Sequence, residues 1–123
     1  MKILFLGDVV GISGCSKIMN NLKSEIEKKK INFVIINGEN SAEPGVGLTK
    51  ETCNDFFNCG VNVITTGNHV WDQKEIMSHI EKENRLLRPH NLFEPAPGKG
   101  FEIYESSENI KIGVLNLMGN VFM

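Results

Sequence analysis

Side chains that bind metal ions or transfer protons follow three apolar stretches of the chain. Asp8 comes after the first stretch, Glu39 and Asn40 after the second, and Asn68 and His69 after the third. A glycine directly precedes the polar residues in each case, and glycine lets the backbone approach a ligand closely. Oxygen donors together with an imidazole suit a divalent metal such as manganese or iron. These residue types therefore predict a metal site, provided that the fold brings the three places together.

Each of these five residues also has an ordinary structural role that the sequence leaves open. Asp8 could cap the turn that follows it, and Asn68 could adopt the left-handed turn conformation that Asn tolerates. Glu39 and Asn40 could be loop surface, and His69 could simply face solvent. We favour the metal hypothesis because every one of these ordinary roles would have to hold at the same edge of the same sheet.

The elements between these residues are predicted to alternate between strand and helix. The expected order is strand 2–6, helix 15–30, strand 33–37, helix 50–59 and strand 61–66. Such an α/β chain forms right-handed βαβ units, so the carboxyl ends of its strands lie along one edge of a parallel sheet. Because α/β proteins usually carry their chemistry at that edge, the sequence places all five polar residues where a site is expected.

The rest of the chain is predicted to hold a short helix, a loop and an antiparallel pair of strands. Asp72 and Glu75 have the spacing of a capping box for a helix that holds Ile76, Met77 and Ile80. The next segment is rich in Pro and Gly, which indicates a loop with one short strand. The loop is expected at 85–100, and the two strands at 101–106 and 110–117.

The composition is that of one small globular domain covering residues 1–123. Apolar residues make up 41% of the chain and the net charge is −2, so strong binding to nucleic acid or to an anionic membrane is not indicated. No apolar run reaches the ~20 residues of a membrane-spanning helix, and the apolar N-terminal stretch is too short for a signal peptide. We therefore expect a cytoplasmic protein. Its cysteines are expected to be small buried side chains rather than zinc ligands: Cys15, Cys53 and Cys59.

A nucleotide-binding module is an alternative interpretation of the N-terminal region. Gly7, Gly11 and Gly14 precede a predicted helix, and Glu39 follows the second strand, where a ribose-binding acid would lie. The glycines lack the spacing of a dinucleotide-binding loop, however. Asp8 would also place a carboxylate close to the expected pyrophosphate, where like charges repel.

Several motifs in this order and spacing resemble the YmdB-type family of metallophosphoesterases, relatives of the calcineurin-like phosphoesterases. They are GDVVG, INGEN, GLT, TTGNHVWD, RPHN, PGKG and VLNLMG, which together extend over nearly the whole chain. The resemblance implies the N-terminal half of a metallophosphoesterase sandwich. It also implies hydrolysis of small phosphodiesters, including cyclic nucleotides, at a centre of two iron or manganese ions.

The resemblance assigns a role to each of the five polar residues. Asp8 and Asn40 correspond to ligands of one metal, Asn68 to a ligand of the second, and Glu39 to the ligand that bridges both. His69 corresponds to the catalytic His that protonates the leaving group. Two metals ~3.5–4 Å apart can share a hydroxide and stabilise both ends of an in-line displacement.

Members of this family are about twice as long as this chain, and their second half supplies three further His ligands. The other histidines here are His79, expected to be a solvated helix residue, and His90, expected in a loop. We therefore expect an incomplete site that binds a single ion weakly, so activity of this chain as an enzyme is uncertain. The alternatives are a non-catalytic remnant and the nucleotide-binding module. A sheet that lacks later strands exposes an edge, so we expect a homo-oligomer or a marginally stable chain.

Overall fold

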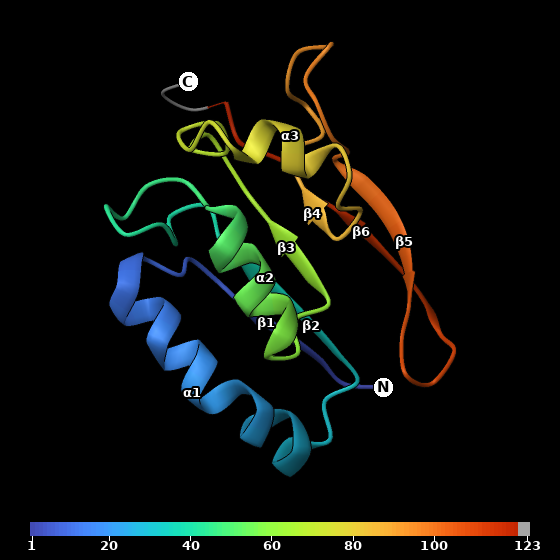
Figure 1. The fold of residues 1–123 in the computed structure, drawn as a ribbon. Coiled ribbons are helices and arrows are strands. Elements are labelled where there is room, and N and C mark those ends of the chain that lie inside the picture. The colour runs from blue at the N-terminus through green and yellow to red at the C-terminus, as the bar shows by residue number, and fades with distance from the viewer. Residues whose placement is uncertain (121–123) are drawn as a thin grey trace.

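A four-stranded parallel sheet forms the centre of the computed structural model, which describes residues 1–120 (Figure 1). Its strands, in spatial order, are β1 (Ile3–Leu6), β2 (Phe33–Asn37), β3 (Val63–Thr65) and β4 (Leu86–Leu87). The register aligns Ile3 with Phe33, Ile35 with Val63, and Ile64 with Leu86. The predicted α/β fold with a parallel βαβαβ unit is confirmed, and β4 is the short strand expected within the loop segment.

Helices cover one face of this sheet and bury most of the core (Figure 1). They are α1 (Gly11–Lys29), α2 (Lys50–Asn58) and α3 (Ile76–Ile80). Val34, Ile36 and Ile64 point toward these helices and are almost fully buried with Phe56 and Leu48. The helix predicted from residue 15 begins earlier, at Gly11, because the apolar periodicity that marks a helix starts only after its glycine-containing first turn.

An antiparallel pair, β5 (Phe101–Glu105) and β6 (Lys111–Leu115), packs on the other face of the sheet. Ile112 and Val114 of β6 contact the alternate side chains of the sheet, Phe33, Val63 and Leu87. The turn between the two strands has Asn109 at a positive φ of 57°, and Ser106 N donates to Ile110 O at 2.9 Å. The antiparallel pair predicted from the sequence is confirmed, and the molecule has helices, sheet and hairpin in three layers.

The capping box predicted from Asp72 and Glu75 is wrong. Helix α3 begins at Ile76, and the side chain of Glu75 does not cap it. Glu75 instead accepts a hydrogen bond from the Lys50 amide at 2.7 Å, at the first turn of α2. The predicted cap of α2 is confirmed, because the Thr49 hydroxyl accepts from the Thr52 amide at 3.1 Å. The Glu75 carboxylate and the Thr49 hydroxyl therefore each accept from a backbone amide in the first turn of α2 that has no partner within the helix.

The cysteines and His79 are less exposed than their positions in and beside the helices would require. All three cysteines are buried free thiols, as expected, and burial raises the pKa of Cys53 to about 12. His79 is not the solvated residue that was expected. Its ring is half-buried with Nε2 lacking a hydrogen-bond partner, and burial lowers the pKa of this imidazole. No helix within residues 1–120 has the length and apolar character to cross a bilayer.

Candidate metal-binding and catalytic site

Backbone hydrogen bonds bring the carboxyl ends of the sheet strands together. Val9 N donates to Asn37 O at 3.1 Å, which ties the end of β1 to β2. Gly38 N donates to Thr65 O at 3.0 Å, which ties the end of β2 to β3. The polar residues that follow these three strands therefore lie at one edge, as the topology predicted.

Asp8 and Asn40 are in direct contact at this edge. Asn40 Nδ2 donates to Asp8 Oδ1 at 2.9 Å, although the two residues are 32 positions apart. Asp8 has a left-handed backbone with φ 29°, a conformation that is uncommon outside glycine and is often found at functional sites. The amide nitrogen of Asn40 thus holds the Asp8 carboxylate across the sheet edge.

Glu39 lies between the ends of β1 and β3. Its carboxylate packs so closely on Gly67 that a Cβ at position 67 would coincide with it. Burial raises the pKa of Glu39, the charge of Asp8 raises it further, and His69 acts in the opposite direction. Glu39 therefore interacts with charged groups from both neighbouring loops, which is the position that a ligand shared between two ions would need.

His69 is oriented by Asp72. The distance from His69 Nδ1 to Asp72 Oδ2 is 2.7 Å, and both side chains are partly exposed. When Asp72 is ionised, Nδ1 carries the proton of this hydrogen bond and Nε2 is the ring nitrogen left for a ligand or a proton. The sequence did not predict this role for Asp72, because its spacing from Glu75 imitates a capping box.

Asn68 lies with the other possible metal ligands, and together these residues fit an incomplete metal site. Asn68 follows Gly67 directly, so it lies at the same edge as Glu39, with its side chain exposed. Within residues 1–120, no three His, Cys, Asp or Glu side chains are grouped so as to hold a metal ion. Of the charged donors, Asp8 contributes to the raised pKa of Glu39, and a bound cation would relieve the repulsion between these two carboxylates. His90 is exposed in the loop after β4, as expected.

Two buried polar residues, which no sequence pattern marks as part of a site, support this edge. Asn116, in the VLNLMG motif, donates from Nδ2 to Thr66 O at 2.8 Å and to Leu87 O at 3.1 Å, which ties the end of β6 to β3 and β4. Arg88 is buried and donates to Pro89 O at 3.0 Å and to Glu94 Oε1 at 3.0 Å, which holds the loop after β4. Their burial, which is unusual for polar side chains, could not be seen in the sequence.

The nucleotide-binding alternative loses support from the same loop. A phosphate-binding loop presents free backbone amides to the phosphate. Here Val9 N donates to Asn37 O at 3.1 Å, and Gly11 N donates to Asn40 O at 2.9 Å. These amides are used to join the loop to the end of β2, so they cannot also bind a pyrophosphate without rearrangement.

The chain is similar to known proteins in both sequence and fold. The chain is 42% identical over 123 residues to a 2′,3′-cyclic-nucleotide 2′-phosphodiesterase of Bacillus subtilis, a match that covers 100% of this chain and 46% of that protein. Its fold matches the crystal structure of a hypothetical protein from Thermus thermophilus, with a TM-score of 0.91 at 34% identity over 100% of this chain and 47% of the other.

A second solved structure and a protein family also match this chain. The structure of a phosphatase from Mycoplasma pneumoniae matches with a TM-score of 0.86 at 37% identity, over 98% of this chain and 43% of that one. The chain thus spans about half the length of the relatives that it matches. The YmdB-like protein family matches residues 4–123. This chain belongs to the YmdB-like protein family.

Proposed function

We propose that this chain forms the N-terminal half of a metal-dependent phosphodiesterase that hydrolyses small phosphodiesters such as 2′,3′-cyclic nucleotides. The observation that carries the proposal is the position of Glu39, which lies on Gly67 and interacts electrostatically with both Asp8 and His69. Support for the substrate comes from the Bacillus subtilis relative, whose name specifies 2′,3′-cyclic nucleotides. The buried free thiols are compatible with work in the reducing cytoplasm, where we propose that the protein acts.

The residues at the edge fit divalent manganese or iron in their chemistry. Asp8 and Asn40 would hold one ion, Asn68 the second, and Glu39 both, since carboxylate and amide oxygens are ligands for hard cations. Amide ligands bring no charge, so a bound cation would keep its attraction for an anionic phosphate. Bound ions would supply an activated water and neutralise charge that develops on the phosphoryl oxygens.

The chain's own residues perform the remaining tasks. Asp72 fixes the ring of His69 through the 2.7 Å contact at Nδ1, so a proton held at Nε2 can be delivered to the leaving oxygen. The carboxylate of Asp72 also stabilises the positive charge that His69 carries before it donates that proton. Asn40 holds the Asp8 carboxylate in place through its 2.9 Å hydrogen bond, which limits the motion of both side chains.

A chimera tests this function directly. Residues 1–123 of this chain would replace the matching 46% of the Bacillus subtilis relative, and hydrolysis of 2′,3′-cyclic nucleotides would be measured with added Mn²⁺. We expect activity in the chimera, loss of nearly all of it in Glu39→Gln, and a decrease in kcat of about 10²–10⁴-fold in His69→Ala. Glu105→Gln, which alters an exposed carboxylate on β5, is the control and should leave kcat unchanged. A folded chimera without activity, or full activity in Glu39→Gln, would refute the proposal.

A further inference from the structure

The segment that carries His69 has no regular secondary structure. Residues 66–75, between β3 and α3, form turns and bends. Val70 is fully buried and anchors this segment at the core, and Asp72 N donates to His69 O at 3.2 Å within the turn. The turn therefore holds His69 and Asp72 together, while the exposed part of the segment needs a contact from elsewhere to fix its place.

The loop that precedes α2 supplies this contact. Gln73 Nε2 donates to Val46 O at 3.1 Å, although the two residues are 27 positions apart. Gly47 packs against the same side chain, because a Cβ at this glycine would lie 2.8 Å from Gln73 Cγ and 3.2 Å from Asp72 Cβ. Gly47 also has a φ of 82°, in the left-handed region that favours glycine. The two segments thus approach more closely than a residue with a side chain would allow.

The other end of this loop is joined to the proposed metal ligands. The loop follows Asn40 directly, and the Asn40 side chain donates to Asp8 Oδ1 at 2.9 Å. Ala42 N donates to Gly47 O at 2.9 Å, and Gly45 N donates to Ala42 O at 2.8 Å. These hydrogen bonds close the loop on itself. It is therefore a compact connection between Asn40 on one side and the segment of His69 on the other.

We propose that Gln73 is a positioning residue, which holds the turn of His69 in a fixed place relative to Asp8 and Asn40. It acts through the carbonyl of Val46 and rests on the proposed function, in which His69 protonates the leaving group. A general acid must lie within about 2.6–3.2 Å of the atom that receives its proton. A misplacement of about 1 Å in such a site can lower the rate by about 10²-fold. The single hydrogen bond of Gln73 therefore affects the reaction from outside the site.

A purely structural role for Gln73 is the alternative explanation of this hydrogen bond. The segment has a second contact with the same region, because Glu75 Oε1 accepts from the Lys50 amide at 2.7 Å. Gln73 also lines an open polar hollow of about 680 Å³ at the start of α2, where water can replace a lost partner. Loss of the Gln73 hydrogen bond should therefore displace the turn without unfolding the chain.

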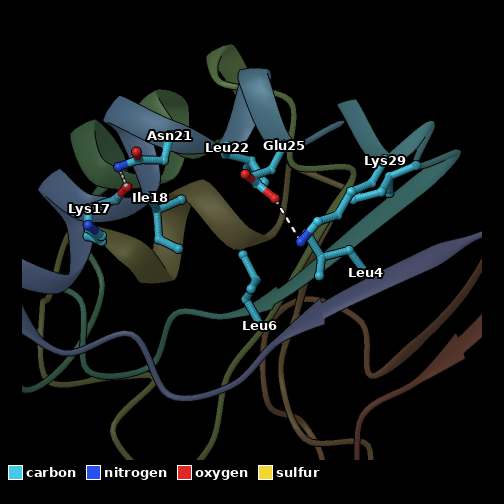
Figure 2. Close-up of a pocket in the computed structure, with 9 residues that line it drawn as sticks. Leu4, Leu6, Lys17, Ile18, Asn21, Leu22, Glu25 and Lys29 are labelled. Carbon is cyan, nitrogen blue, oxygen red and sulfur yellow. Dashed lines mark hydrogen bonds and ion pairs between the residues drawn. The ribbon is translucent and has the colours of Figure 1, made fainter. Parts of the chain in front are cut away.

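Two substitutions of the same kind separate these explanations. Gln73→Met removes the donor and keeps the length of the side chain, so its contact with Gly47 remains. Asn21→Leu is the matched control. Figure 2 shows that Asn21 also donates from a side-chain amide to a backbone carbonyl, that of Lys17, at 2.8 Å on the exposed surface of α1. The control therefore removes the same type of hydrogen bond outside the two connected segments.

Hydrogen exchange of the chain alone tests the connection without metal, substrate or hydrolysis. We expect Gln73→Met to speed exchange by about fivefold or more on both sides of the contact, at the amides of Ala42, Gly45 and Asp72. Asn21→Leu should leave these three rates unchanged. Unchanged rates in Gln73→Met, or the same increase in both variants, would overturn the proposal whether or not the protein hydrolyses phosphodiesters.

Kinetics of the chimera test the consequence for the reaction. We expect Gln73→Met to lower kcat about tenfold and to change KM by less than about twofold, because His69 acts in the transition state. The Tm and the tautomer populations of His69 should stay close to those of the wild type, since Asp72 still lies beside Nδ1.

The outcomes distinguish failure of this proposal from failure of the proposed function. An active wild-type chimera with unchanged kcat in Gln73→Met would overturn the role of Gln73 alone. A tautomer shift equal to that of Asp72→Ala would also overturn it, since the change would then lie in the imidazole and not in its place. An inactive, folded wild-type chimera would refute the proposed function, and the role of Gln73 in the reaction with it.

Discussion

Glu39 is the residue on which the proposed site depends most, and its neighbour Gly67 leaves the space that its carboxylate occupies. The sequence indicated Glu39 through its place after β2, and glycine at 67 through the GNH motif. The contact between them could not be predicted, because it depends on how the loop after β2 folds over the loop after β3. The residues were therefore recognisable by type, while their mutual positions required the structure.

Gly67→Ala should weaken Mn²⁺ binding at least tenfold. The added Cβ would take the place of the Glu39 carboxylate, which must then turn away from the strand ends. Isothermal titration with Mn²⁺ would measure the effect. Gly119→Ala is the matched control, since a Cβ at that glycine meets nothing within 4 Å. Equal Mn²⁺ affinity in the Gly67→Ala variant and the wild type would show that Glu39 is not a ligand.

Asp72 determines which nitrogen of His69 carries the proton. Neutral His69 in the wild type should be the Nδ1–H tautomer, because Nδ1 lies 2.7 Å from the Asp72 carboxylate. Asp72→Ala should move the population toward the Nε2–H tautomer, which is the more common form of a neutral histidine side chain in water. The ¹⁵N chemical shifts of the ring report this directly. If the wild type and Asp72→Ala have the same tautomer populations of His69, Asp72 does not orient this ring.

At the scale of elements, strands were predictable because buried parallel strands are continuous apolar runs, and β2 and β3 lie where the sequence placed them. The first residue of α1 and the capping of α3 could not be predicted correctly from the sequence. Two glycines obscure the first turn of α1, and the side chains of Asp72 and Glu75 both leave their expected helix for partners outside it. Local patterns cannot distinguish a side chain that caps its own helix from one that bonds a distant group.

Thr49→Ala should lower the free energy of unfolding by about 1 kcal/mol. The hydroxyl of Thr49 accepts from the Thr52 amide at 3.1 Å, and alanine leaves that amide without its partner. For a domain of this size the change corresponds to a decrease in Tm of roughly 2–8 °C. Thermal unfolding followed by circular dichroism measures it, and Thr49→Ser should restore most of the loss. An unchanged Tm would mean that water satisfies the amide equally well.

At the scale of the whole molecule, the main feature is an apolar strand at an open edge. The family resemblance predicted such an edge, and within residues 1–120 β1 pairs with β2 alone. It could not be located from the sequence, because the four residues of β1 are those of a covered strand. Which elements lie beside a strand depends on how distant parts of the chain pack, and the composition of the strand itself does not show this.

The isolated chain should therefore associate weakly with itself. Open strand edges pair readily, and Ile3 and Phe5 add apolar surface next to this one. Light scattering over a series of concentrations should show a mass that rises with concentration in the wild type and much less in Phe5→Asp. A mass that stays at that of the monomer in the wild type would contradict this expectation.

Binding of Mn²⁺ to the isolated chain, observed residue by residue, is the most direct test of the proposed metal site. Paramagnetic Mn²⁺ broadens the NMR signals of amides near it. We expect substoichiometric Mn²⁺ to broaden selectively the amides of Asp8, Glu39, Asn40, Asn68 and His69. Glu39→Gln should abolish this pattern, and Glu105→Gln should preserve it. Broadening elsewhere, or the same broadening in Glu39→Gln, would show that the carboxyl edge of the sheet is not a metal site in this protein.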